Sequence, residues 1–365
     1  MGTVWCGSGV TNLDHDSDGP LRTSDFDYVL PPNLIAQTPL EKRDASRLLV
    51  LDRASGDVTH TSFSRLPDFL VAGDLLVANN SRVIPARLHG YREATNGSVE
   101  LLLLRQEGAE WSSLARPARK LRSGERLVFP SRQPHGSDAV AVVTSHRGEG
   151  EVTVRFEDDA DQRLQDYGVA PLPPYILEKL NDEERYQTVY GSRAGSAAAP
   201  TAGLHFTPEL LTRLRRMGVL WAEVTLHVGL DTFRPIAVEN VSEHRIHQEW
   251  CEVSDAVAQD IAACRRRGNR VIAVGTTAAR TLETLGRNWS DDSPRGVSGM
   301  TGEFIVPGHE WKLVNSLLTN FHLPRSTLLM LVSALAGREA ILSAYAEAVN
   351  RGYRFFSFGD AMLIR

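Results

Sequence analysis

Short apolar runs alternate with segments of helical spacing in the second half of the chain, from about residue 199 onward. Runs typical of buried strands cover residues 221–230, 271–274, 317–319 and 353–358. Apolar residues recur every three or four positions over residues 208–217, 255–267, 278–285, 327–336 and 339–349. Thr207, Ser254 and Ser326 precede three of these segments and are typical helix caps. Strands that alternate with helices predict a largely parallel sheet with helices outside it.

Residues 82–157 show a different pattern, with no helical period. Six short stretches of alternating character follow one another at 83–88, 99–104, 111–115, 126–129, 139–144 and 152–156. Such a series predicts a small antiparallel barrel or sandwich. We therefore expect an α/β protein in which a small β-domain of residues 82–157 is inserted into a large domain of residues 25–81 and 158–365. Residues 1–24 are rich in Gly, Ser, Thr and Asp without periodicity, which predicts a disordered tail.

Charge is distributed unevenly between these two parts. The 365-residue chain has a net charge of −5, so its overall field does not favour a nucleic-acid partner. Between residues 82 and 132, however, ten Lys and Arg residues outnumber five Glu. Arg116, Arg119, Lys120 and Arg122 crowd one loop. Either solvated surface charge or binding to a phosphate backbone explains such a loop.

The cysteines and the apolar runs bear on where the protein works. Cys6, Cys251 and Cys264 are scattered and include no C-x-x-C pair, which argues against a disulfide framework or a zinc finger and for a reducing compartment. No apolar run approaches the roughly 20 residues that span a bilayer. The amino-terminal residues have no signal-peptide pattern. We expect a cytoplasmic protein with no membrane partner.

Polar residues lie within or just beyond several strands of the helix-alternating part. Since strand ends of a parallel sheet share one edge, these residues are expected to form a pocket there. They are His227, Thr276, Thr277, Asn320, His322 and Asp360. The Gly-Thr-Thr turn at 275–277 opens a helix and is suited to a carboxylate, with Arg280 one turn further on.

The stretch Ala-Pro-Thr-Ala-Gly-Leu-His-Phe at 199–206 precedes another helix start. Its small, turn-prone residues Thr201 and Gly203 would let a ligand approach the backbone, and His205 ends the run. A tight turn with a packed histidine is the structural alternative. Neither a dinucleotide nor a nucleoside-triphosphate motif is present, and H-E-x-x-H and G-x-S-x-G are also absent. His244 and His247 together with the other histidines leave a metal-dependent hydrolase open, although we expect no metal.

Many longer motifs carry a family resemblance. They include Phe-Asp-Tyr at 26–28, Asn-Asn-Ser-Arg-Val-Ile-Pro-Ala-Arg at 79–87, Leu-Pro-Pro-Tyr-Ile at 172–176, Tyr-Gln-Thr-Val-Tyr at 186–190, the stretch 199–206, Thr-Leu-His-Val-Gly at 225–229, Val-Gly-Thr-Thr at 274–277, Thr-Asn-Phe-His-Leu-Pro at 319–324 and Gly-Asp-Ala-Met at 359–362. With these motifs the chain resembles the S-adenosylmethionine:tRNA ribosyltransferase-isomerases of queuosine biosynthesis, from about Ser24 to its end. Asp231, where the family usually has Gly, and Ala197, where Val is common, depart from the pattern.

The resemblance implies a large α/β barrel-like domain with an inserted small antiparallel β-barrel. It also implies transfer and isomerisation of the ribosyl part of S-adenosylmethionine, as co-substrate, onto 7-aminomethyl-7-deazaguanine at the tRNA wobble position. Epoxyqueuosine-tRNA, adenine and methionine would be the products. A paralogue with a different acceptor and a non-catalytic RNA-binding protein are the alternatives, beside the hydrolase.

This chemistry assigns expected roles to the candidate residues. His205, His227 and His322 would transfer protons, and Asp360 would orient one of them or hold an amine. Thr276, Thr277 and Arg280 would bind the methionine carboxylate, and the basic loop would contact tRNA phosphates. The other expected substrate-binding residues are Thr201, Gly203, Asn320, Asn80 and Arg82. We expect a monomer.

Overall fold

The computed structural model describes residues 19–148, 150–229 and 236–365, so residues 1–18 of the expected tail and Asp231 lie outside the described residues. The end of the predicted tail is folded. Thr23 is fully buried, and its backbone N–H and hydroxyl donate to the carbonyls of Glu239 and Val238 at 2.8 and 2.7 Å. The large domain therefore uses residues before Asp25.

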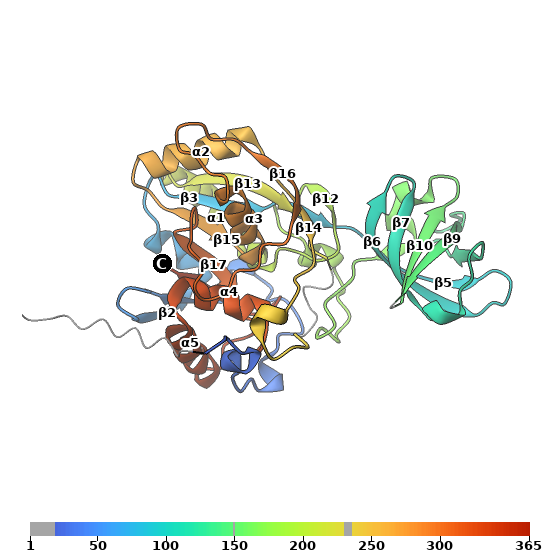
Figure 1. The fold of residues 1–365 in the computed structure, drawn as a ribbon, viewed down its shortest axis with the longest axis horizontal. Coiled ribbons are helices and arrows are strands. Elements are labelled where there is room, and N and C mark those ends of the chain that lie inside the picture. Colours follow the sequence, from blue (N-terminus) through green and yellow to red (C-terminus); the bar gives the residue numbers. More distant parts are fainter. Residues whose placement is uncertain (1–18, 149, 230–235) are drawn as a thin grey trace, which may run out of the picture.

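Nine strands form one large mixed sheet (Figure 1). Their order is β16 (Val297–Thr301), β14 (Glu249–Val253), β13 (Leu220–Leu226), β3 (Leu75–Asn79), β15 (Val271–Val274), β17 (Ser316–Asn320), β18 (Ala361–Ile364), β1 (Arg47–Leu51) and β2 (Val58–Ser62). The central strands β13, β3, β15 and β17 are parallel, as expected. The flanks are not: β18 runs antiparallel to β17 and parallel to β1. The predicted strand at 353–358 is wrong, because the final strand begins at Ala361.

Helices cover both faces of this sheet. Alternate residues of each strand point to opposite faces, so each face has its own core. Leu75 and Val77 of β3 pack with α2 (Asp255–Arg266), α3 (Thr276–Gly286), α4 (Thr327–Ala336) and α5 (Arg338–Asn350). Leu76 and Ala78 pack with α1 (Pro208–Arg216) on the other face. The side chains of Thr207, Ser254 and Ser326 accept from backbone N–H groups in the first turns of α1, α2 and α4, which confirms the predicted caps.

The inserted part is a closed antiparallel barrel. Its strands are β5 (Arg87–Arg92), β6 (Ser98–Glu107), β7 (Glu110–Arg116), β10 (Glu151–Phe156), β9 (Ala139–Gly148) and β8 (Arg126–Phe129), and pairing of β5 with β8 closes the ring. Five of the six predicted strands are confirmed. The first, at 83–88, is wrong, because β4 (Ser81–Val83) pairs with β12 (Arg193–Ser196) in the large domain. The barrel has its own core, which includes Leu101, Leu127 and Val154.

The barrel stands to one side of the large domain and is joined to it by two chain segments (Figure 1). Strand β11 (Gly168–Val169), on the returning segment, still pairs with β5. The division at residues 82 and 157 stays a prediction. Within the described ranges no single helix is long and apolar enough to cross a membrane, and only α4 and α5, bent by 114° at their junction, pass that test as a pair.

Candidate active site

Strand direction brings distant residues to one edge of the large sheet. The parallel strands β3, β15 and β17 end at this edge. Because Asn320 of β17 pairs with Ala361 of the antiparallel β18, and Ala361 also pairs with Leu48 of β1, the beginnings of β18 and β1 lie at the same edge. Asp360 and Ser46 therefore join the strand ends that sequence reasoning considered.

A cavity of about 80 Å³ opens at this edge, and we call it the rim cavity. It is enclosed by the 199–202 turn, the starts of α3 and α4, and the end of β17. Five of the predicted site residues line it: Thr201, Thr276, Thr277, Asn320 and His322. The expected convergence is thus present for these five.

His205 lies behind the rim cavity, in a chain of hydrogen bonds. The Asn320 side-chain amide donates to the Phe356 carbonyl at 3.1 Å, which fixes its nitrogen, and the same NH₂ lies 3.1 Å from His205 Nε2. Nε2 must therefore accept, so Nδ1 carries the proton and donates to Ser46 Oγ at 2.8 Å. The Thr201 hydroxyl completes the chain by donating to the side-chain oxygen Oδ1 of Asn320 at 3.1 Å. His205 is a neutral side chain with both nitrogens engaged.

Burial strengthens this conclusion for two of the three histidines. His205 and His322 are 4% and 7% exposed, and burial lowers the pKa of each to about 3. Nearby Arg354 and Arg43 lower the pKa of His205 further. His322 Nε2 lies 3.0 Å from the Thr319 hydroxyl, and its backbone N–H donates to Tyr345 at 3.1 Å. Neither ring is placed to gain a proton near pH 7.

The start of α3 presents unused backbone donors to the rim cavity. Gly275 precedes the helix with φ +90° and has no side chain to cap it. Within the described ranges, the N–H groups of Thr276 and Thr277 have no backbone acceptor. Free N–H groups and the helix dipole favour an anion at this position.

His227 lies outside the rim cavity, at the junction with the barrel. It lines a cavity of about 610 Å³ between the two domains, which we call the junction cavity. Its ring stacks on Trp250 with centroids 5.3 Å apart and planes at 19°, and Nδ1 is 3.3 Å from Ser81 Oγ. The neighbouring residue Val228 lines both cavities. His227 is half-buried, and burial together with Arg193 lowers its pKa.

Two predicted residues serve the fold instead of lining the rim cavity. Arg280 is 4% exposed, forms an ion pair with Glu249, and donates to the Glu303 carbonyl at 2.9 Å. It lines a separate cavity of about 330 Å³. Asp360 is 1% exposed and accepts from the backbone N–H groups of Arg47 and Arg354, at 2.8 and 2.9 Å, and from the Arg47 guanidinium. Asp360 therefore clamps the start of β18 to β1.

Three further predicted residues have local partners. Asn80 accepts from the Thr225 hydroxyl at 2.8 Å, and Arg82 forms an ion pair with Glu184. A Cβ atom on Gly203 would lie 1.9 Å from the Tyr190 hydroxyl oxygen. The small size of Gly203 thus makes room for a tyrosine.

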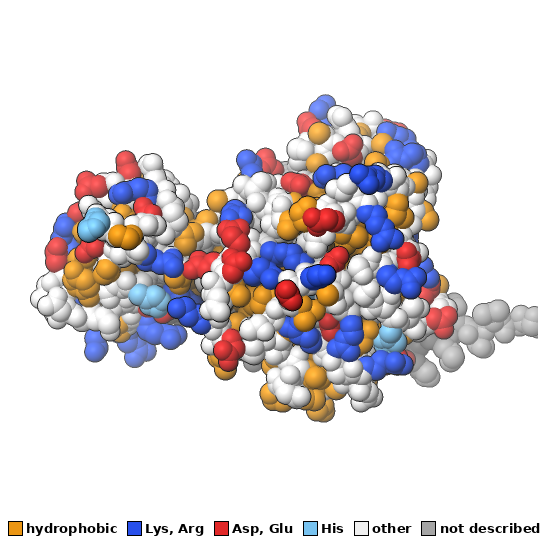
Figure 2. All heavy atoms as spheres, turned by 180° about the vertical axis from the view of Figure 1, so that it is seen from behind, with side chains coloured by type: hydrophobic (Ala, Val, Ile, Leu, Met, Phe, Trp, Pro, Cys, Tyr) orange, Lys and Arg blue, Asp and Glu red, His pale blue; other side chains and the backbone are white. Residues whose placement is uncertain are grey.

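The basic loop of the barrel is solvent-exposed. Lys and Arg side chains gather along one edge of the barrel (Figure 2). Arg116, Arg119, Lys120 and Arg122 are all exposed, and among the described residues none of the four side chains forms an ion pair. By contrast, Arg126 pairs with Glu93 and Glu157. Unpaired cations are free to bind phosphate.

No group of three or more His, Cys, Asp or Glu side chains in the described part of the chain is arranged to hold a metal ion. His205, His227 and His322 occupy three separate environments, which gives the hydrolase alternative no structural support.

Comparison with known proteins connects this geometry to a family. A family model described as "Queuosine biosynthesis protein" matches residues 23–364. The chain belongs to this family. An S-adenosylmethionine:tRNA ribosyltransferase-isomerase of Moorella thermoacetica is 54% identical over 345 residues, which are 94% of this chain and 100% of that relative. The crystal structure of an S-adenosylmethionine tRNA ribosyltransferase from Thermotoga maritima is 41% identical, with a TM-score of 0.55, and the match covers 94% of this chain and 100% of that one.

These matches confirm that the protein is an enzyme of the ribosyltransferase-isomerase type with an α/β fold and an inserted antiparallel barrel. Sequence reasoning missed three residues around the site. Ser46 supports His205, and Trp250 stacks on His227. Asn79 is fully buried and donates to the Leu226 carbonyl at 2.9 Å and to Thr277 at 3.2 Å. Asn79 ends a buried strand, and this position in the sequence could have marked it as a candidate site residue.

Proposed function

We propose that this enzyme transfers the ribosyl moiety of S-adenosylmethionine to 7-aminomethyl-7-deazaguanine at the wobble position of tRNA and isomerises it. The products are epoxyqueuosine-tRNA, adenine and methionine. The family supports this type of reaction. The observation that carries the proposal is the meeting of two cavities at Val228, one with free helix N–H groups and one with a half-buried histidine.

The rim cavity binds the methionine end of S-adenosylmethionine in this proposal. Its 80 Å³ is small beside the roughly 300–1,000 Å³ of ligand pockets, so it accommodates only one end of the co-substrate. The carboxylate binds the N–H groups of Thr276 and Thr277. Both N–H donors of the Asn320 amide are engaged, so Asn320 offers its side-chain oxygen to the ammonium group of the methionine end. The sulfonium and ribose then extend past Val228 toward the junction cavity. Arg280, already paired with Glu249, is not needed for this contact.

His227 is the proton-transfer residue that the geometry favours. Its lowered pKa keeps the ring neutral at pH 7, so it can take a proton from the carbon beside the sulfonium. The imidazolium formed in this step is then available to protonate the departing adenine. His205 and His322 act as positioning residues, because they hold Asn320 and the end of β17.

The barrel supplies the RNA contacts in this proposal. The unpaired cations Arg116, Arg119, Lys120 and Arg122 bind tRNA phosphates. A cytoplasmic location and a monomeric state remain predictions.

Adenine and methionine release tests the function. Purified enzyme is incubated with S-adenosylmethionine in three parallel reactions. These contain modified tRNA, its isolated anticodon stem-loop, or the free modified base as the acceptor. We expect release with both RNAs and not with the free base. Equal reaction of the free base would refute the tRNA claim, and release only with another modified RNA would identify a paralogue. Loss of activity on chelation would favour the metal-dependent alternative.

A further inference from the structure

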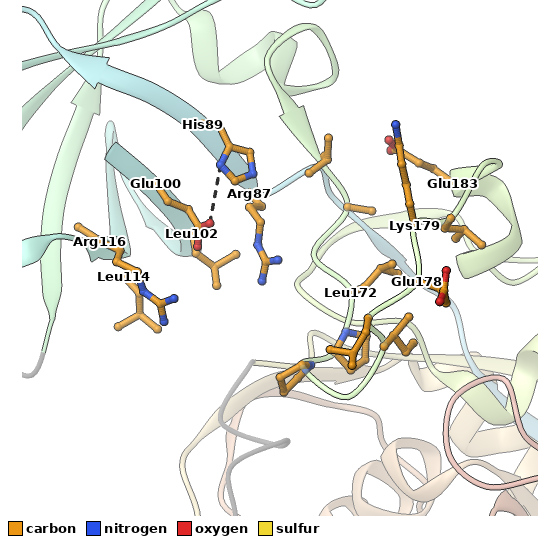
Figure 3. Close-up of a pocket in the computed structure, with 18 of the residues that line it drawn as sticks. Arg87, His89, Glu100, Leu102, Leu114, Arg116, Leu172, Glu178, Lys179 and Glu183 are labelled. Atoms are coloured by element: carbon orange, nitrogen blue, oxygen red, sulfur yellow. Dashed lines mark ion pairs between the residues drawn. The ribbon is translucent and has the colours of Figure 1, made fainter. Parts of the chain in front are cut away.

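A second large cavity adjoins the junction cavity along the barrel. It measures about 840 Å³ and lies between β5, β6 and β7 and the returning segment of the large domain (Figure 3). Leu114 of β7 lines both cavities, and β6 passes from Leu102 in one to Leu104 in the other. The two cavities are thus consecutive sections of one interdomain groove.

The first section has unpaired cations on its barrel wall. Arg87 and Arg116 point from the barrel into the gap (Figure 3). Among the described residues Arg87 Nε has no hydrogen-bond partner, and Arg116 has no ion pair. The acidic side chains of this section are Glu100, which lies 3.7 Å from His89, Glu178, and Glu183, which pairs with Arg132. Lys179 is the third cation of the section. On the barrel wall two Arg side chains accompany one Glu, so this wall adds one net positive charge next to the basic loop.

The second section has a flat aromatic wall. It is made by the stacked rings of His227 and Trp250, and Trp250 is only half-buried. Stacking on such rings binds nucleobases whatever their sequence and contributes about 1–3 kcal/mol per base. Because Val228 separates this wall from the rim cavity, a base bound here lies next to the ribosyl donor.

We propose that the interdomain groove binds a single-stranded stretch of the substrate RNA. Its backbone lies along Arg87 and Arg116, and the acceptor base is turned out of the strand and stacks against Trp250. Protein enzymes that modify a base of a nucleic acid commonly turn that base out of the stack to reach it. This inference rests on the proposed function and adds where the acceptor base binds.

The test uses full-length enzyme and an anticodon stem-loop that carries 7-aminomethyl-7-deazaguanine. Trp250→Leu is expected to raise the KM and the Kd for the stem-loop about 5- to 150-fold, and Trp250→Phe to change them less than about threefold. The affinity for S-adenosylmethionine, measured by calorimetry without RNA, should fall less than the affinity for the stem-loop, and a larger fall would overturn the proposal because it would assign the stacking contact to adenine. Trp289→Leu is the matched control, because Trp289 is also half-buried but lies outside the groove. An unchanged KM in Trp250→Leu would overturn the aromatic contact.

Arg87→Gln tests the other section. It should weaken binding of the modified stem-loop and of the same stem-loop with unmodified guanine equally, and lower the salt slope by about 0.7. A loss confined to the modified RNA, or no loss, would overturn the backbone contact.

Hydrogen exchange on the wild-type enzyme keeps the test independent of variant folding. Stem-loop binding should protect β14 and the facing strands β6 and β7, and absence of protection there would overturn the proposal. If the wild-type enzyme binds the stem-loop with this protection but releases no adenine, the proposed reaction fails while the groove assignment stands.

Discussion

The side-chain amide of Asn320 donates to Nε2 of His205 across 3.1 Å, so the histidine at the end of the 199–206 stretch is an acceptor in the folded enzyme. Its Nδ1–H is held by Ser46. A ring fixed in this way positions the rim cavity and does not exchange protons with a substrate.

Acid should therefore destabilise the enzyme through its two buried histidines. Both have folded-state pKa values near 3, below the ordinary 6.5, so between pH 6.5 and 3 the unfolded chain binds more protons. The free energy of unfolding should fall as the pH is lowered through this window, by up to about 1.4 kcal/mol per pH unit for each ring. The free energy of unfolding, measured with urea at several pH values, should depend less steeply on pH in His322→Gln than in the wild type. In His135→Gln, which replaces an exposed histidine, the pH dependence should equal that of the wild type. Equal slopes in all three proteins would contradict this account.

Replacement of His227 should remove catalysis more than binding. His227→Gln is expected to lower kcat/KM for adenine release about 10²- to 10⁴-fold, the usual contribution of a general acid–base group. Because its pKa is lowered, the wild-type rate should decline only below pH 6.5, and this decline should vanish in the variant. His322→Gln should keep it. Wild-type turnover in His227→Gln would rule out the assignment.

Removal of the exposed cations should change the salt dependence of RNA binding. The combined variant Arg119→Ala, Lys120→Ala and Arg122→Ala should lower the slope of log Kd against log salt by about 0.7 for each lost phosphate contact. S-adenosylmethionine binding should be unaffected. Arg126→Ala, whose cation is paired with Glu93 and Glu157, is the control. An equal change of the salt slope in the control would contradict a specific contact between the basic loop and RNA phosphates.

Asp360 should prove structural. Asp360→Asn removes the charge that the Arg47 guanidinium faces and weakens the acceptor of two backbone N–H groups. We expect a loss of about 1–3 kcal/mol in the free energy of unfolding, measured with urea. The folded variant should keep the wild-type pH profile of adenine release, and a changed profile would restore a direct role.

Gly203 and Tyr190 should be energetically coupled. Gly203→Ala places a methyl group on the Tyr190 hydroxyl and should cost about 1–3 kcal/mol. Tyr190→Phe alone should change stability little, because that hydroxyl has no partner among the described residues. The double variant should recover part of the loss, and simple additivity would disprove the steric explanation.

Local pattern predicted much of the fold. The helix at 327–336 and the strand at 271–274 occur with the expected limits, because caps and apolar spacing act within a few residues. The strand predicted at 353–358 is wrong because Phe355 and Phe356 are buried in an irregular segment and not in a strand. Phe355 forms only an isolated β-bridge with Ile35, and Phe356 has φ +70°, which interrupts an extended strand.

The candidate site was predictable only in part, since tertiary geometry selects between neighbours. Asn79 and Asn80 are adjacent, but the pleat turns Asn79 toward Thr277 and Asn80 toward Thr225. Arg280 lies one turn beyond Thr276, yet its helix face meets Glu249. The direction of β18 brings Asp360 to the same edge of the large sheet as the end of β17. This direction depends on long-range strand pairing that no local pattern encodes.

The pairing of Leu48 with Ala361 has a consequence for synthesis of the chain. Strand β1 leaves the ribosome early, but the parallel neighbour that completes its ladder is made more than three hundred residues later. The barrel lies between them and is built mainly from successive hairpins, which close quickly. The barrel can therefore fold while the large sheet still lacks strand β18.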